Sequence, residues 1–357
     1  MNRSFFLLLA AVFISFSAVA QDLNCVKFTQ QKRPNERLNI RIPDVLGYKV
    51  LKCDFHSHTV FSDGNVWPQI RIFEAWGHGL DAISITDHIE YLPHKDYIKG
   101  GDFNSSHQLA KSTADNLGII LIKGAEITRQ QPDIGHFNAL FIQDANPLKV
   151  DDPEAAIDAA LAQNAFILWN HPGWNTDSCY IRPFQEKLFK AGKIHGIEVF
   201  NGSEFYPYAV QWCFDKKLPH FGNSDTHTLI EGEINLNSYF RNMTLVLVKE
   251  HSEAGIREAL FAGRTIAYST HHLAGKPEYL KALFLASVEW RKFRSDEKWD
   301  YYHFSNQSDI PYEIRSAGGK YKLGAGQTTE CKFTKGSDEL KMEVLNMHTG
   351  TTSVLSL

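Results

Sequence analysis

The chain has 357 residues, of which 43% are hydrophobic and 22% are charged. This composition excludes a disordered chain or a collagen-like repeat, and the length allows one large domain with a small addition. The net charge is −4 and no long run of Lys or Arg occurs. Duplex nucleic acid is therefore not the expected partner, because its binders usually carry a basic surface.

The first twenty residues have the layout of a cleavable secretory signal. Asn2-Arg3 gives a short positive start, the stretch from Phe5 to Phe16 is almost entirely apolar, and Ala18-Val19-Ala20 follows. We expect cleavage after Ala20 and export to the periplasm or the medium. A membrane anchor is the alternative, but the apolar run is short for a span. No other stretch of the sequence is apolar enough to cross a membrane.

The chain has an odd number of cysteines, and their spacing shows no Cys-x-x-Cys zinc pattern. In an exported protein we expect at most one or two disulfides. The cysteines are Cys25, Cys53, Cys179, Cys213 and Cys331.

From about Val50, short apolar runs alternate with amphipathic segments, which predicts an α/β fold built on a mostly parallel sheet or barrel. The predicted strands are Val50–Phe55, Ala82–Thr86, Ile119–Ile122, Phe137–Ile142, Phe166–Trp169, Gly196–Phe200, His220–Gly222, Thr244–Val248 and Thr265–Tyr268. The predicted helices between them include Pro68–Trp76, Glu154–Ala162 and Glu253–Phe261.

After about Lys276 the sequence changes character. Tyr279–Trp290 is predicted as one helix, and Asp309–Leu357 as a small β-rich tail without a cluster of potential ligands. In this tail Leu340, Met342 and Val344 alternate with polar residues, which is the period of a half-buried strand. We therefore expect a signal peptide over residues 1–20, a catalytic domain over 21–275 and a C-terminal extension over 276–357.

The first of several candidate metal ligands are His56 and His58. Alternate residues of a strand share a face, so the two imidazoles project toward one point and suit one metal ion. Taken alone, a His-x-His pair is a weak signal.

Further polar groups follow one predicted strand after another, at the end where βα barrels gather their catalytic groups. Taken singly, each could cap a turn or lie on the surface. Taken together they indicate a polynuclear metal site, because convergent imidazoles and carboxylates are seldom buried without a partner. These groups are Asp87-His88, Glu126, His171, Asp225 and His227, while His136 precedes a strand.

The ordered set of motifs resembles the polymerase-and-histidinol-phosphatase (PHP) superfamily. The motifs are His-x-His with Ser-Asp-Gly following, then Thr-Asp-His, Gly-x-Glu, Gly-His, Asn-His-Pro-Gly and Ser-Asp-x-His, and they cover about Val50 to Tyr268. The resemblance implies a distorted (β/α)7 TIM-like barrel that binds three divalent metal ions. With its leader and its β-rich tail, the chain looks most like the exported bacterial phosphodiesterases that act on small organic diesters.

By position, the resemblance assigns three sets of metal ligands. The first ion would be held by His56, His58, Glu126 and Asp225. Glu126 would bridge to a second ion on His136 and His171, and the third would be held by Asp63, His88 and His227. Catalytic roles fall to Glu126, Asp225, His227 and Asp87, with Asp87 expected to orient a neighbouring ligand.

Mixed His and carboxylate ligands suit Mn, Zn or Fe better than Mg or Ca. We expect hydroxide between the first two ions to attack phosphorus in line.

Candidate contacts to the phosphate, which could equally be surface groups, are Lys95, Arg129, Tyr180 and Arg182. Asn201 and Glu204 open onto the same rim. Aromatic residues that could wall an ester pocket or simply pack are Tyr91, Trp174, Tyr206 and Tyr208.

Three other functions remain open at this stage. The closest is a phosphomonoesterase acting on nucleotides, sugar phosphates or histidinol-phosphate-like substrates with the same metals. An amidohydrolase would bridge two metals with a modified lysine, where this chain has Glu126. The third is a metal-storing or binding module without catalysis. The partner expected for either esterase is a small-molecule phosphoester.

Overall fold

The computed structural model describes residues 36–128, 133–174, 176, 178–336 and 340–357. The expected signal peptide, Cys25 and Arg129 lie outside these ranges. Within them no helix combines the length and the apolar character that a bilayer crossing needs. The four cysteines in these ranges, Cys53, Cys179, Cys213 and Cys331, are unpaired.

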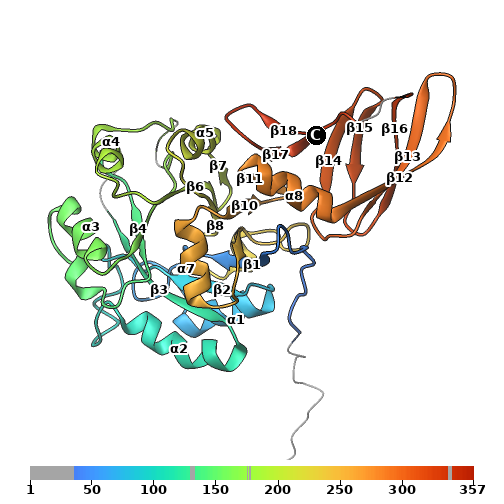
Figure 1. The fold of residues 1–357 in the computed structure, drawn as a ribbon. Helices are drawn as coiled ribbons and strands as arrows, with labels where there is room; N and C mark the ends of the chain where they lie inside the picture. Colours follow the sequence, from blue (N-terminus) through green and yellow to red (C-terminus); the bar gives the residue numbers. More distant parts are fainter. Residues whose placement is uncertain (1–35, 129–132, 175, 177, 337–339) are drawn as a thin grey trace, which may run out of the picture. The chain divides into compact units, whose positions relative to one another are not determined.

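Strands and helices alternate through most of the chain, and a purely β region follows at its C-terminal end (Figure 1). The strands of the α/β region are β1 (Lys49–Asp54), β2 (Ala82–Ile85), β3 (Ile120–Ile127), β4 (Phe137–Leu140), β5 (Phe166–Trp169), β6 (Gly196–Asn201), β7 (Glu204–Phe205), β8 (His220–Asn223), β9 (Met243–Val248), β10 (Thr265–Ser269) and β11 (His272–Gly275). Its helices are α1 (Pro68–Gly77), α2 (Ser105–Leu117), η2 (Asn146–Leu148), α3 (Pro153–Leu161), α4 (Pro183–Lys190), α5 (Pro207–Asp215), α6 (Ile230–Glu233), α7 (Glu253–Phe261) and α8 (Pro277–Ser287).

The main sheet is mixed, although most of its ligand-bearing strands run in one direction. β1, β2 and β3 pair in parallel, as do β5, β6 and β8, whereas β4 lies antiparallel between β3 and β5. The expectation of a mostly parallel sheet is thus only partly met, because β3 and β4 are consecutive strands without a helix between them. The reversal matters for the site, since the start of β4 lies at the same edge as the ends of its neighbours.

The strand pairing does not close into the (β/α)7 barrel that the resemblance implied. Among the described residues no backbone ladder joins β8 to β1, β9 or β10. Instead, Thr244 of β9 bonds both backbone groups of Gly222 through its hydroxyl, at 3.0 and 3.1 Å. Just beyond the strand ends, an isolated parallel bridge joins Ser57 to Thr226. Two backbone hydrogen bonds form it, from Asp225 N to His56 O at 2.9 Å and from His58 N to Thr226 O at 3.0 Å.

The helices form where the sequence provides a start signal and an apolar face. α1 begins with Pro68 at its first turn and buries Ile72 and Ala75, and α7 is capped at its N-terminus by Ser252, whose side chain accepts from Gly255 N. α1 and α2 pack on each other, and they cover β2 and β3 (Figure 1).

The C-terminal region differs from the prediction at its start. α8 ends at Ser287, and Val288 begins a strand, so the predicted helix Tyr279–Trp290 is three residues too long. Trp290 instead stacks on Phe304 of the neighbouring strand, with ring centroids 5.4 Å apart. The strands are β12 (Val288–Ser295), β13 (Trp299–Asn306), β14 (Tyr312–Ser316), β15 (Gly319–Leu323), β16 (Thr328–Thr334), β17 (Glu343–His348) and β18 (Val354–Ser356).

The β-rich extension continues the main sheet. β17 pairs in parallel with β11, and β14 and β15 follow at the edge, while β12, β13 and β16 form a separate three-stranded sheet. Of the alternating run predicted around Met342, Leu340 and Met342 precede β17 and Val344 lies in it, with Met342 and Val344 buried.

Candidate metal centre

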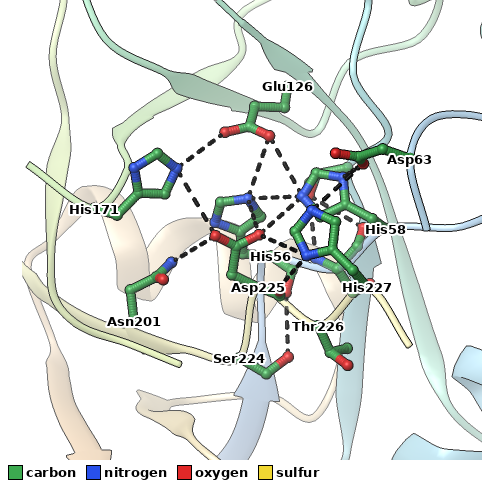
Figure 2. A network of polar contacts seen from close by, with 12 residues as sticks. His56, His58, Asp63, Glu126, His171, Asn201, Ser224, Asp225, Thr226 and His227 are labelled. Carbon is green, nitrogen blue, oxygen red and sulfur yellow. Dashed lines mark hydrogen bonds and ion pairs between the residues drawn. The ribbon is translucent and has the colours of Figure 1, made fainter. Parts of the chain in front are cut away.

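Imidazoles and carboxylates from six strand ends meet at one edge of the sheet. Glu126 and Asp225 point toward the histidines from two sides (Figure 2). β1, β2, β3, β5 and β8 supply groups at or just after their C-terminal ends, and the reversed β4 supplies one just before its start. These groups are His56, His58, His88, Glu126, His136, His171 and Asp225, joined by Asp63 and His227 from the following loops.

His56, His58 and Asp225 form the first of three clusters. The Nε2 atoms of His56 and His58 are 3.1 Å apart. Oδ1 of Asp225 lies 3.1 Å from the first and 2.9 Å from the second. Oε2 of Glu126 lies 3.4 Å from both nitrogens. The four residues expected around the first ion are thus brought together.

The second cluster consists of His56, Glu126 and His171, and His136 lies beside it. Oε1 of Glu126 lies 3.2 Å from Nδ1 of His136 and 3.5 Å from Nε2 of His171. The two oxygens of one buried carboxylate therefore face different sets of ring nitrogens, which is the geometry of a bridging ligand.

The third cluster consists of His58, Asp63, His88 and His227. Nε2 of His88 lies 3.4 Å from Oδ2 of Asp63, and Nε2 of His227 lies 3.4 Å from Oδ1. His58 joins this cluster through Nδ1, 3.7 Å from Oδ1 of Asp63. Its ring therefore lies between the first and third clusters.

The spacing of these atoms fits metal ions. Ligand atoms about 2.0–2.2 Å from one ion lie about 2.9–3.6 Å from each other in octahedral or tetrahedral coordination. The separations in the first cluster fall in that range. In addition, Oε2 of Glu126, Nδ1 of His136 and Oδ1 of Asp63 are buried and make no hydrogen bond, although Oε2 of Glu126 lies 2.9 Å from Nδ1 of His88. Buried polar atoms of this kind indicate a missing partner, and the donor set suits a divalent transition metal.

The charges of the centre are strongly coupled. Burial alone would raise the pKa of Glu126, but His88, His56 and His136 hold it well below its usual range, so the carboxylate is ionised. Burial, together with the positive charges of His227 and His88, lowers the pKa of His58 to about 4. A neutral ring with a free lone pair is the form that binds a metal.

Glu198 of β6 is a functional residue that the sequence did not reveal. It is fully buried and accepts from Nδ1 of His56 at 2.9 Å and from the backbone N of His171 at 2.8 Å. The backbone of His171 has a positive φ of 25°, an uncommon conformation for a non-glycine residue. Asn201 and Asn223 donate to the same carboxylate at 2.9 and 2.8 Å. A charged residue at the third position of an apolar strand was the available signal.

Asp87 is directed at a loop and away from the clusters. Its carboxylate accepts from the backbone N and the hydroxyl of Thr59 and from the hydroxyl of Ser62, each at 2.7 Å. Ser62 lies 3.4 Å from Nδ1 of His58. Asp87 therefore holds the turn between His58 and Asp63, in keeping with an orienting role.

The residues predicted to contact substrate are not brought together. Arg182 is largely buried and stacks over the ring of Tyr180 at 4.2 Å. Among the described residues, neither side chain hydrogen-bonds or ion-pairs with a member of the clusters. Glu204 accepts a hydrogen bond from Tyr206, which is buried, whereas Tyr208 is exposed on α5. Asn201 does reach the centre, where it donates to Oδ2 of Asp225 at 3.2 Å.

Two of the predicted aromatic residues and Lys95 lie beside the centre. Trp174 is half exposed, with its ring 5.3 Å from that of His136 and 5.5 Å from that of His171. Tyr91 lies 6.0 Å from the ring of His88. Lys95 lines a cavity of about 320 Å³ that begins at Asp87 and His88.

An α/β sheet whose strand ends carry such a ligand set defines a metal-dependent enzyme. A two-domain protein from Bacteroides vulgatus ATCC 8482, described as containing a predicted PHP-like metal-dependent phosphoesterase, has 38% sequence identity to this chain. Its structure matches 90% of this chain and 98% of its own, with a TM-score of 0.85. The chain belongs to this PHP-like family of metal-dependent phosphoesterases.

The remaining comparisons are weaker. Histidinol phosphate phosphatase from Lactococcus lactis has 19% identity over 50% of this chain and 87% of its own, with a TM-score of 0.30. The lesion-specific endonuclease Q from Pyrococcus furiosus has 16% identity over 64% and 59%, with a TM-score of 0.41. An uncharacterized protein of Methanocaldococcus jannaschii is 37% identical over 82 residues, 23% of this chain and 36% of that protein's length. No family model matches the sequence.

Proposed function

We propose that this phosphoesterase hydrolyses small organic phosphodiesters at a centre of three divalent ions, with Mn, Zn or Fe as the metals. The three clusters of ligand atoms, which share His56 and His58, support three neighbouring ion positions. When bound, such ions supply Lewis acidity that acidifies water for attack and offsets charge on the phosphoryl oxygens.

The chain's own residues form this centre, and its most buried part surrounds Glu126. His56, His58 and Asp225 would hold an ion on one side of Glu126. His136 and His171 would hold an ion on the other side. Because Glu126 and His56 are fully buried, their charges act in a low-dielectric environment, where electrostatic stabilisation of a transition state is strongest.

The observation that carries the choice of a diester is the kind of charge that pairs with the carboxylates of the centre. Within the described ranges the carboxylates Asp63, Glu126 and Asp225 form ion pairs with histidines alone, and no Lys or Arg joins them. A monoester dianion would call for such cations, whereas a diester carries one negative charge. The net charge of −4 also fits a small substrate better than duplex nucleic acid.

The test compares bis(p-nitrophenyl) phosphate with p-nitrophenyl phosphate, using protein loaded in turn with Mn, Zn or Fe. We expect a higher kcat/KM for the diester with at least one metal and loss of activity after chelation. A consistent preference for the monoester would overturn the choice and favour a phosphomonoesterase.

A matched pair of variants tests the role of Glu126. Glu126→Ala should abolish turnover, because the carboxylate between the ring nitrogens of the centre is lost. Glu186→Gln, a surface change on α4, should leave activity unchanged. Wild-type turnover in Glu126→Ala would contradict the proposed mechanism.

We also propose that the protein is exported, on the strength of the apolar leader over residues 1–20. Mass spectrometry of the protein purified from its own cells should find a mature chain that begins at Gln21. An intact Met1 in that sample would contradict export by cleavage.

A further inference from the structure

The cavity next to His88 has the size and lining of a small-molecule pocket. Its volume of about 320 Å³ is at the lower end of the range for ligand sites, too small for a polymer. One end is formed by Asp87 and His88 of the centre. Its apolar walls are Val60, Phe61, Leu92, Ile98 and Phe103.

The loop that forms the outer wall is held in place before any ligand arrives. Phe103 donates from its backbone to Oδ1 of Asn146 at 3.3 Å, and Asn146 donates to Asp102 at 2.9 Å. Gly101 has a φ of +84°, and a Cβ there would lie 2.3 Å from the hydroxyl of Ser105. A preformed wall of this kind lowers the ordering cost of binding.

The two carboxylates that line the cavity already have hydrogen-bond partners in the protein. Asp87 is saturated by Thr59 and Ser62, and Asp102 accepts from Asn146 and from the backbone of Asn104 at 2.9 Å. Both carboxylates are therefore turned to protein donors.

Two cavity groups have no such partner. In the described ranges Lys95 has no ion pair, although its backbone N donates to Leu92 O at 3.3 Å. Nε2 of His94 is buried and has no hydrogen-bond partner. The charge left available to a ligand is thus the ammonium of Lys95, with the imidazole of His94 as a second polar contact.

We propose that this cavity binds one ester arm of the substrate and that Lys95 binds an anionic group on that arm. This inference rests on the proposed phosphodiesterase function and adds the substrate class: a diester with a compact, partly apolar arm that bears a carboxylate or a second phosphate. The apolar walls contact the body of the arm, and the reacting phosphorus lies at the His88 end of the cavity.

The test uses three diesters that release the same p-nitrophenolate. Their second arms are phenyl, 4-carboxyphenyl and 4-(aminomethyl)phenyl. With the metal-loaded enzyme we expect kcat/KM to be about threefold to fivefold higher for the carboxylated arm than for phenyl, the size of a partly exposed charge interaction. A preference for the aminomethyl arm would overturn the proposal.

Matched variants separate Lys95 from general effects of charge. Lys95→Met should abolish the preference for the carboxylated arm over the phenyl arm, and Lys95→Arg should retain the preference. Lys99→Met, on the same loop but outside the cavity lining, should behave as wild type. An unchanged preference in Lys95→Met would overturn the assignment.

A binding measurement distinguishes failure of this proposal from failure of the proposed function. Calorimetric titration should show 4-carboxyphenylphosphonate binding more tightly than phenylphosphonate to wild type and equally in Lys95→Met. If the phenyl diester is hydrolysed but the two phosphonates bind alike, the cavity assignment is wrong and the esterase function stands. If none of the diesters is hydrolysed, the proposed function itself fails.

Discussion

Nδ1 of His56 donates a hydrogen bond to the carboxylate of Glu198 at 2.9 Å, and both side chains are fully buried. The bond fixes the tautomer of His56, so its Nε2 offers a lone pair toward Asp225 and Glu126. Through a second hydrogen bond to the backbone of His171, the same carboxylate couples ligands of two clusters.

Replacing Glu198 should therefore weaken metal binding without removing a ligand. Glu198→Gln is expected to lower metal affinity by about 10–100-fold, the usual effect of losing a partner of a ligating histidine. Competition titration with a chromogenic chelator measures it. Glu204→Gln, on the same hairpin, should leave the affinity unchanged, and equal affinities in all three proteins would refute the coupling.

Asp87→Asn should act on the third cluster more than on the first. The amide cannot accept all three hydrogen bonds from Thr59 and Ser62, so the turn that carries Asp63 loosens. We expect one equivalent of metal fewer per chain than in wild type after gel filtration, measured by elemental analysis. Asp151→Asn, a surface change, is the control, and an unaltered metal content in Asp87→Asn would contradict the orienting role.

Metal binding should release protons and tighten as the pH rises. Burial opposes protonation of His88, but Glu126 and Asp63 outweigh it and raise its pKa to about 10. In the metal-free protein the ring is thus protonated below that pH, and a metal must displace the proton. Apparent affinity should increase by up to about tenfold per pH unit between about pH 6 and 8 for each proton released.

Calorimetry in buffers of different ionisation enthalpy counts these protons. A binding enthalpy that does not depend on the buffer would contradict the prediction.

The buried pair of Asp54 and Arg241 should dominate local stability beneath the site. Arg241 donates to Asp54, both side chains are inaccessible, and Asp54 also accepts from the backbone of Ser224 at 3.1 Å. Asp54→Asn leaves a buried guanidinium without its counter-charge, and we expect a loss of about 3–5 kcal/mol in the free energy of unfolding.

Urea denaturation of the metal-free protein measures this change. Asp309→Asn, which removes the charged partner of the exposed Arg41, should change the stability much less. Similar losses in the two variants would show that burial of the ion pair does not determine how much the free energy of unfolding falls.

Much of the fold was predictable because apolar runs and turn signals are local. β5 and α7 have the predicted bounds, since each is a short buried run or an amphipathic turn sequence between clear boundaries. The end of α8 was missed because Val288 and Trp290 continue an apolar pattern without Gly or Pro, and the choice of strand depends on β13. Whether the barrel closes could not be predicted from the sequence either, because closure depends on contacts between β8 and β9.

The grouping of these side chains was predictable for a different reason, namely that His and acidic residues recur at successive strand ends. The residues that hold these side chains in position were not predictable. Glu198 and Asn170 are isolated polar residues in or after apolar strands, and their partners are far away in sequence: Asn170 donates to Oε1 of Glu126 at 2.7 Å. A polar residue inside a buried strand signals a partner but not which one.

The backbone bridge between Ser57 and Thr226 has a consequence for how this centre can change over evolution. It ties the segment carrying His56 and His58 to the one carrying Asp225 and His227 through main-chain atoms alone. The spacing between these four positions therefore does not depend on which side chains occupy them. A single substitution at one of these positions can therefore change which metal is preferred, while the backbone that holds the other positions stays the same.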